Sequence, residues 1–214
     1  PTPPPPPETY TFIASSAASD VYKRHDLAVT GAFRDLGDAL VHQGYVWNLV
    51  TGTFEAPDGQ RFERDIVRSP GAVGIVPLVF DPEGQASVVL VRQYRPSYDG
   101  DVTEIPAGMR DVPDEPVAVT GARELREEAG LVAERIDHLI DLYPSPGLTD
   151  SVTTILLATG CTVVEHERQG PEEQEMELLH LVVDDAIAMI ERGELRDAKT
   201  VVGLLLADRR LRSR

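Results

Sequence analysis

The chain has few cysteines and no long apolar run, and each shortage excludes a class of protein. Its single cysteine, Cys161, cannot close a disulfide within the chain, which fits a reducing compartment, and we expect a buried structural thiol. No stretch approaches the roughly 18 consecutive apolar residues of a membrane-spanning helix. The proline-rich start lacks the basic and then apolar pattern of a secretory signal. The sequence therefore predicts a cytoplasmic protein with no membrane partner.

Basic residues are also scarce. The 214 residues include 20 Lys and Arg against 36 Asp and Glu, a formal net charge of −16. A surface with this surplus repels phosphodiester backbones unless a strong local basic patch compensates, and the sequence shows no such patch. We therefore expect no nucleic-acid partner.

Three regions of different character follow one another along the chain. Residues 1–8 are mostly proline and predict a disordered tail, because consecutive prolines form an extended segment without internal hydrogen bonds. Residues 9–69 contain short β patterns, and the Asp58-Gly59 pair between two of them favours a hairpin. Within this N-terminal β subdomain, residues 20–42 are ambiguous, since Asp35 to Gln43 has helical spacing but no clear cap. Residues 70–214 form the main domain.

The main domain alternates strand and helix patterns. Two apolar runs, 72–80 and 86–95, flank a turn and predict neighbouring buried strands. A helix is expected over 115–129, with Asp114 as its cap, Gly130 at its end, and a packing stripe of Ala118, Ala122, Leu125 and Ala129. Further strands are expected near 139–143 and 153–159. Two helices, each opened by an Asp cap, are expected at 184–192 and 197–210.

Three carboxylates share one face of the 115–129 helix. Glu124, Glu127 and Glu128 stand at i, i+3 and i+4, so their charges repel one another and favour a compensating cation. Mg²⁺ or Mn²⁺ prefers such oxygen ligands, and a bound dication would let an acidic protein hold an anionic diphosphate. The alternative is a solvated acidic face paired with Arg123 and Arg126.

The segment that contains these carboxylates resembles the Nudix box. The pattern is filled at Gly108, Glu115, Arg123, Glu124, Leu125, Glu127, Glu128, Gly130 and Leu131. Six residues separate Gly108 from Glu115 where the pattern has five, which lengthens the loop and leaves the helix register intact. The resemblance implies an α/β fold with a mixed β-sheet between α-helices, here preceded by an N-terminal antiparallel β subdomain.

Features outside the box resemble the ADP-ribose pyrophosphatases of that family. These are the run Arg92 to Arg95, the run Glu104 to Gly108, and Pro146, sixteen residues beyond Gly130. The resemblance implies hydrolysis of ADP-ribose to AMP and ribose 5-phosphate. Relatives carry a Glu shortly after the proline, where this chain has Asp150-Ser151, so another sugar diphosphate stays open as the substrate.

The same resemblance implies a role for each candidate site residue. Two or three divalent ions would be held by the carbonyl of Ala107 and by Glu124, Glu127 and Glu128. Glu173, on a loop beyond the box, would reach the metals and serve as the base, with Glu172 and Glu175 as alternatives. Arg123 would orient a box carboxylate. Substrate contacts are expected at Arg92, Arg95, Glu104 and Pro146, with one of the two arginines on phosphate.

The resemblance also bears on assembly and on other functions. In this family the N-terminal β unit commonly crosses to a partner subunit and lines the adenine pocket, which implies a homodimer; Trp47 in that unit is otherwise expected to anchor a core. The alternatives are a Nudix hydrolase for another nucleoside diphosphate derivative, such as a nucleotide sugar, a dinucleoside polyphosphate or an oxidised nucleotide, and a non-catalytic ligand-sensing Nudix domain. The intact box glutamates and the lack of a basic helix-turn-helix pattern argue against the sensor.

Overall fold

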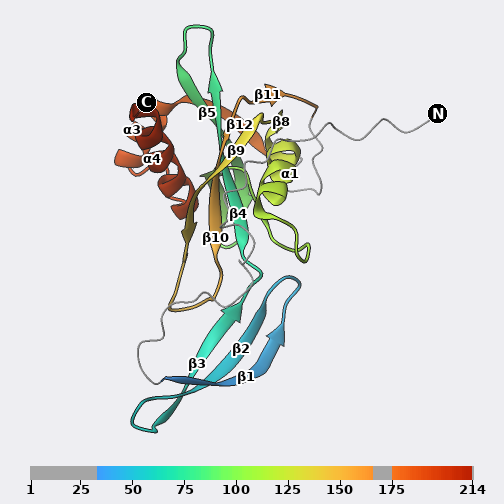
Figure 1. The fold of residues 1–214 in the computed structure, drawn as a ribbon, viewed down its shortest axis with the longest axis vertical. Coiled ribbons are helices and arrows are strands. Elements are labelled where there is room, and N and C mark those ends of the chain that lie inside the picture. The colour runs from blue at the N-terminus through green and yellow to red at the C-terminus, as the bar shows by residue number, and fades with distance from the viewer. Residues whose placement is uncertain (1–32, 166–174, 214) are drawn as a thin grey trace, which may run out of the picture.

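The computed structural model describes residues 33–165 and 175–213, in which a small antiparallel sheet precedes a larger mixed sheet flanked by helices (Figure 1). The small sheet has the order β1-β2-β3. Its strands are β1 (Arg34–Gln43), β2 (Asn48–Glu55) and β3 (Arg61–Arg68). The tail predicted at residues 1–8 and the first β pattern lie outside the described residues.

Strand β1 replaces the helical spacing that the sequence suggested for residues 35–43. It pairs antiparallel with β2 from Arg34 opposite Glu55 to Gln43 opposite Asn48. Gly37 has a φ of 118° at one of its two register shifts, a conformation that no α-helix accommodates. Pairing with a neighbouring strand thus outweighs a short and uncapped helical pattern.

The β2–β3 hairpin forms as predicted. Its turn is closed by a 2.8 Å hydrogen bond from the amide of Ala56 to the carbonyl of Gln60, and Gly59 supplies the positive φ that the turn requires.

The larger sheet has the order β12-β5-β4-β10-β9, with β6 beside β5 and β7 beside β4. β10 runs parallel to β4 and the other pairings are antiparallel, so the sheet is mixed as predicted. Its strands are β4 (Ala72–Phe80), β5 (Ala86–Arg95), β6 (Gly100–Glu104), β7 (Ala107–Met109), β9 (Arg135–Leu142), β10 (Thr153–Thr159) and β12 (Glu177–Val182). Two short strands, β8 (Leu131–Val132) and β11 (Thr162–Val163), pair separately.

Helices cover both faces of this sheet (Figure 1). Helix α1 (Val117–Ala129) packs on one face, where Leu125 and Ala129 join a buried cluster with strands β4 and β10. Helices α3 (Val183–Glu191) and α4 (Ala198–Arg212) pack on the other, where Leu204 lies among buried side chains of the same strands. Gly121 permits the close approach of α1, because a Cβ there would come within 2.5 Å of Leu156 Cδ1.

The helix ends match the sequence in part. Gly130 ends α1 with a left-handed φ of 60°, and Asp197 caps α4 by accepting a hydrogen bond from the amide of Thr200. The other two Asp caps are wrong: Pro116 stands at the N-cap of α1, and Val182 at that of α3. Neither Pro116 nor Val182 makes a side-chain cap hydrogen bond, so α1 and α3 begin without a carboxylate cap.

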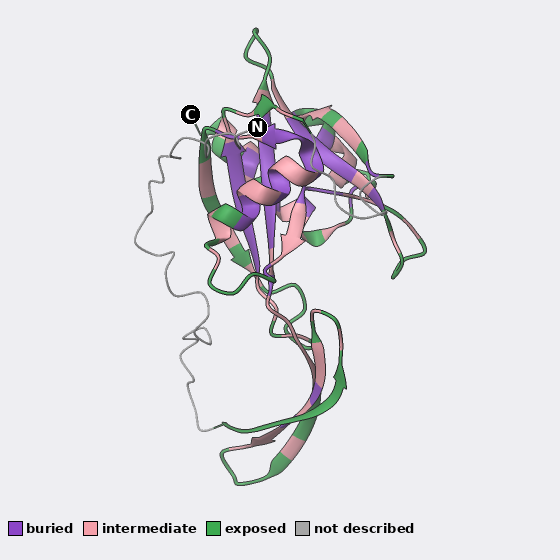
Figure 2. Cartoon of the chain, turned by 90° about the vertical axis from the view of Figure 1, so that its right-hand side faces the viewer, coloured by how far each residue is buried: buried purple, intermediate pink, exposed green. Residues whose placement is uncertain are grey.

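The small sheet projects from the main domain (Figure 2) and is bonded to the loop between β9 and β10. The amide of Val67 donates to the carbonyl of Leu148 at 2.9 Å, and Thr149 Oγ1 donates to the carbonyl of Val67 at 2.7 Å. Arg68 bridges Asp38 of β1 and Asp150 of that loop, at 2.9 and 3.2 Å. These bonds hold the end of β3 against one loop of the main domain.

The small sheet leaves large apolar side chains in contact with solvent. Every residue of β1 is exposed, and Leu40 is 62% exposed. Trp47 is 45% exposed, so its expected role as a core anchor is wrong for this chain by itself. Buried residues gather instead in the main domain (Figure 2). Exposed large apolar side chains gathered on one small sheet are typical of an interaction surface.

Two smaller sequence expectations have direct outcomes. Cys161 is a free, half-buried thiol, and burial raises its pKa to about 11, so it stays protonated at neutral pH. None of the helices in the described residues is long and apolar enough to cross a membrane.

We predict that the chain forms a homodimer through the sheet of residues 34–68. Leu40→Asp should raise the dimer dissociation constant at least about tenfold, because a carboxylate would be buried without a partner. Val163→Asp is the matched control, since Val163 is also exposed but lies on β11. Sedimentation velocity at micromolar concentration measures both, and a wild-type chain that sediments as a monomer would contradict the prediction.

Candidate functional site

The site is built where the N-terminal half of β7 meets helix α1. β7 is held in register beside β4, with Ala107 opposite Gly74 and Gly108 opposite Val73. The amide of Ala107 donates a 2.8 Å hydrogen bond to Oε2 of Glu128 on α1. The strand therefore fixes the backbone, and the helix brings a carboxylate to it.

A second carboxylate of α1 closes over the next residue. A Cβ added to Gly108 would overlap the carboxylate of Glu124, so only glycine permits this approach. The exposed fractions of Glu124 and Glu128 are 7% and 5%. Two acidic side chains are thus packed against two consecutive backbone positions, on a helix face that the alanine stripe did not identify as buried.

Arg123 compensates part of this negative charge. Its Nη1 lies 2.6 Å from Oε1 of Glu124 and 3.1 Å from Oε2 of Glu127, and its Nη2 lies 3.8 Å from Oε2 of Glu115. Burial lowers the pKa of Arg123, but the charges of Glu124 and Glu127 outweigh burial and raise this pKa above its ordinary value. The pairing expected between Arg123 and the box carboxylates is present.

The oxygen donors at this site fit a hard divalent cation in kind. Glu124, Glu127 and Glu128 come from one helix face, and the backbone of Ala107 lies against them. Within residues 33–165 and 175–213, no three His, Cys, Asp or Glu side chains converge closely enough to hold an ion by themselves. The carboxylates contact Arg123 and the Ala107 amide instead. A cation here would therefore rely on backbone and substrate oxygens as well.

A second charged cluster adjoins this site. Arg95 donates two hydrogen bonds to the Glu104 carboxylate, at 2.6 and 2.8 Å, and Lys199 of α4 bonds to the same carboxylate. Glu104 is only 3% exposed. Burial alone would raise the pKa of Glu104, but the hydrogen bonds from Arg95 and the charge of Lys199 hold this pKa below its ordinary value. The hydrogen bonds to Glu104 raise the pKa of Arg95, and the charge of Glu128 adds to this effect, so the two clusters are electrostatically linked.

Within the described part of the chain, no hydrogen bond or ion pair joins the remaining predicted residues to these two clusters. Arg92 lies 3.3 Å from Glu177 in an exposed ion pair between β5 and β12. Pro146 is exposed in the loop bonded to β3. Glu172 and Glu173 lie outside the described residues, and Glu175 is exposed.

Several residues of the site were missed by sequence reasoning. Thr120 Oγ1 donates to Glu115 at 2.7 Å, and Arg110 Nη2 donates to the carbonyl of Glu115 at 3.2 Å. Lys199 and Thr200 join the Glu104 segment from far along the chain. The Asp197 cap marked where α4 begins, but no local pattern connects that turn with residues 104–107.

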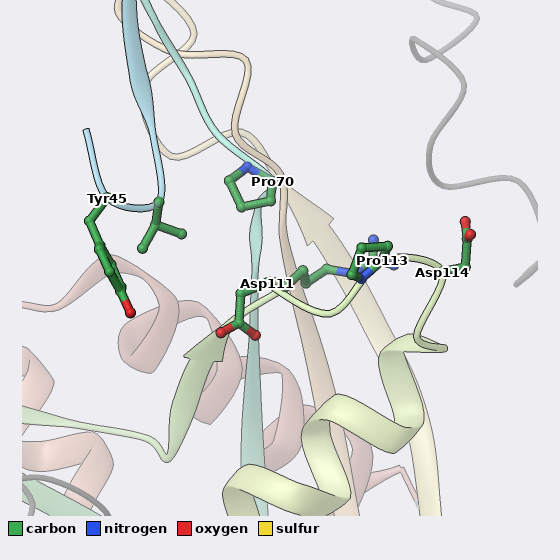
Figure 3. A pocket seen from close by; sticks show the side chains of 7 residues that line it. Tyr45, Pro70, Asp111, Pro113 and Asp114 are labelled. Carbon is green, nitrogen blue, oxygen red and sulfur yellow. The ribbon is translucent and has the colours of Figure 1, made fainter. Parts of the chain in front are cut away.

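A cleft lies beside the loop that leads into α1 (Figure 3). Its volume is about 460 Å³, and it separates the β1–β2 turn from the loop before the helix. It is lined by Tyr45, Val46, Pro70, Arg110, Asp111, Pro113 and Asp114. The small sheet thus approaches the box loop within one chain.

Comparison with known proteins identifies related sequences. Residues 68–201 match the model of the family described as NUDIX domain. An ADP-ribose pyrophosphatase of Bacillus subtilis (strain 168) is 33% identical over 77% of this chain and 86% of that protein. An ADP-ribose pyrophosphatase of Mycobacterium tuberculosis is 33% identical over 81% of this chain and 82% of that protein. A GDP-mannose pyrophosphatase of Citrobacter koseri is 32% identical over 68% of this chain and 81% of that protein.

A solved structure has the same fold. It is described as a crystal structure of ADP compounds hydrolase and superposes with a TM-score of 0.72 over 85% of this chain and 95% of that one. The two sequences are 22% identical, so the likeness concerns the fold.

We predict that Gly108→Ala weakens divalent-cation binding at least about tenfold, because the new methyl group displaces the Glu124 carboxylate from β7. Gly100→Ala is the control, since a Cβ at Gly100 meets only an ordinary 3.8 Å contact. Titration calorimetry with Mn²⁺ measures both variants. Unchanged Mn²⁺ affinity in a folded Gly108→Ala protein would show that Glu124 does not act from this position.

Proposed function

The chain belongs to the Nudix family, and from this membership we propose that it hydrolyses the pyrophosphate bond of ADP-ribose to give AMP and ribose 5-phosphate. The observation that carries the proposal is the packing of Glu124 and Glu128 against Ala107 and Gly108. Two buried carboxylates against one strand are costly in a protein of net charge −16 unless cations are bound nearby. Arg123 supplies one positive charge, and a metal ion is proposed to supply the rest.

Nudix hydrolases generally use divalent metal ions. We assign Mg²⁺ or Mn²⁺ to this chain, with the Ala107 carbonyl, Glu124, Glu127 and Glu128 as its ligands. When bound, such a cation neutralises the diphosphate and lowers the pKa of the attacking water. Arg123 keeps Glu124 and Glu127 oriented, as its distances of 2.6 and 3.1 Å allow.

Arg95 is the better placed of the two candidate phosphate ligands. Its bidentate pair with Glu104 fixes the plane of the guanidinium, which carries more N–H donors than one carboxylate uses. The electrostatic effect of Glu128 on Arg95 supports a position of the Arg95 guanidinium near helix α1, which carries the proposed metal ligands. Arg92, by contrast, is paired with Glu177 at the surface. The proposal therefore places Arg95 on the diphosphate.

The reaction breaks one bond between phosphorus and the bridging oxygen. The oxygen of a water molecule forms a new bond to that phosphorus, the bridging oxygen leaves with the other phosphate, and the proton of the water passes to Glu173. The role of Glu173 rests on the resemblance of the chain to its family, because this residue lies outside the described part of the chain.

A different nucleoside diphosphate sugar is the second candidate substrate. Asp150 stands close to the position where relatives carry a Glu, but it accepts bonds from Arg68 at 3.2 Å and from the amide of Ser69 at 3.0 Å. Because Asp150 is occupied by these bonds, we infer that the sugar is contacted differently from the way the Glu of the ADP-ribose enzymes would contact it. The GDP-mannose relative supports the same alternative.

We predict that the purified chain with Mg²⁺ releases AMP and ribose 5-phosphate in equal amounts from ADP-ribose. Glu127→Gln and Glu128→Gln should each lower turnover about a hundredfold or more, because each removes a metal contact without changing side-chain size. Chromatography of the products measures both effects, with GDP-mannose and dinucleoside polyphosphates as competing substrates.

Three outcomes would contradict parts of this proposal. Faster turnover of GDP-mannose would replace the substrate. Tight binding of ADP-ribose without any products would favour a ligand-sensing domain. Unchanged turnover in both glutamine variants would refute the site.

We predict that Glu173→Gln lowers the catalytic rate strongly while substrate and metal binding change little. A base acts mainly in the transition state, so its loss affects turnover more than ground-state affinity. Glu172→Gln and Glu175→Gln, assayed at saturating Mg²⁺, are the matched comparisons. The largest rate loss at a neighbour would move the assignment, and three unimpaired variants would place the base elsewhere.

A further inference from the structure

The first turn of α4 is bonded to the segment that leads into β7. The amide of Ile105 donates a 2.8 Å hydrogen bond to Oγ1 of Thr200, and the same hydroxyl donates to Oδ2 of Asp197 at 2.6 Å. Ile105 and Thr200 are fully buried. Two residues beyond Ile105 stands Ala107, whose backbone faces the helix carboxylates. The hydroxyl therefore lies behind the backbone that forms the proposed metal site.

The next residue of the same turn acts on a side chain. Lys199 Nζ bonds to the Glu104 carboxylate and lies 3.1 Å from Oδ2 of Asp197. Glu104 in turn holds Arg95 through two hydrogen bonds. Because Glu104 is buried, the hydrogen bonds from Arg95 and the ammonium of Lys199 together keep its carboxylate charged and in one orientation. The plane of the Arg95 guanidinium thus depends on Lys199, which lies far along the chain.

Asp197 links two arms of this network: the Thr200 arm, which bonds to the Ile105 amide, and the Lys199 arm, which bonds to Glu104. Its carboxylate accepts from the amide and the hydroxyl of Thr200, at 3.0 and 2.6 Å, and pairs with Lys199. The group that caps α4 is therefore the group that orients both residues. Helix α4 also packs tightly here, since a Cβ at Gly203 would lie 2.9 Å from Val76 Cγ2. The bonds from Lys199 to Glu104 and from the Ile105 amide to Thr200 join this turn to the Glu104–Ala107 segment.

We propose that Lys199 and Thr200 are positioning residues of the hydrolytic site. Lys199 acts through Glu104 to aim Arg95 at the diphosphate, and Thr200 acts through the Ile105 amide to fix the backbone that presents the Ala107 carbonyl. The role of Lys199, the substrate arm, rests on the proposed function. The role of Thr200, the metal arm, concerns only the cation site and can be tested without turnover.

The test separates the two arms by different readouts. Lys199→Met should raise KM for ADP-ribose about tenfold or more while Mn²⁺ affinity changes little, because a charge-assisted contact that orients Arg95 is lost. Thr200→Val should lower Mn²⁺ affinity, measured by calorimetry, about tenfold. Lys199→Arg and Thr200→Ser retain the positive charge and the hydroxyl respectively, so each should recover most of the loss.

Arg209→Met is the matched control, because it removes an exposed positive charge from the same helix. It should leave KM and Mn²⁺ affinity unchanged. A purely structural role for the turn predicts that Lys199→Met and Thr200→Val lower the unfolding temperature while KM and Mn²⁺ affinity of the folded protein stay at wild-type values. That result would overturn the proposal.

Failure of the proposed function gives a different pattern. If the wild-type chain does not hydrolyse ADP-ribose, the function is refuted, yet a tenfold loss of Mn²⁺ affinity in Thr200→Val with recovery in Thr200→Ser still supports the metal arm. If Thr200→Val does not fold, Thr200→Ser, which keeps the hydroxyl, and Thr200→Cys, which replaces it with a thiol that is a weaker acceptor, measure the same dependence. Equal Mn²⁺ affinity across these variants would refute the metal arm.

Discussion

The close contact between helix α1 and strand β7 is the constraint on which the rest of the site depends. Glu124 and Glu128 are brought against Gly108 and Ala107, where an added Cβ on Gly108 would overlap the Glu124 carboxylate and both glutamates are buried. Buried carboxylates need compensation, and the neighbouring residues are arranged to supply it. Arg123 pairs with Glu124 and Glu127, and a second group of charges stands behind β7.

That second group connects both faces of the sheet. Helix α1 lies on one face and α4 on the other, yet Lys199 at the start of α4 bonds to Glu104, which holds Arg95, and the charge of Glu128 on α1 acts on Arg95. In this cluster the positive charges of Arg95 and Lys199 are matched by the negative charges of Glu104 and Asp197. The cluster is therefore nearly neutral although the protein is strongly acidic. Local pairing of this kind lets an acidic protein present positive groups to an anionic substrate.

The small sheet has a different relation to the main domain. It contributes few buried residues, and its hydrogen bonds to the main domain run through the end of β3 and the loop that contains Pro146. Arg68 joins this loop to β1 through Asp150 and Asp38. The loop that contains Pro146 therefore also supports the small sheet, and Asp150 takes part in that support.

The amino-acid sequence by itself determined the box and the turns at Gly59 and Gly130, because these depend on local spacing and backbone conformation. The mixed sheet between helices followed from the resemblance that the box carries. Only the tertiary structure decided that residues 34–43 form a strand, since strand pairing is a contact between distant segments. It also decided that Glu104 is held by Arg95 and Lys199, for no local pattern brings residues 104 and 199 together. Charge pairs across a core form only after the elements that carry them have packed.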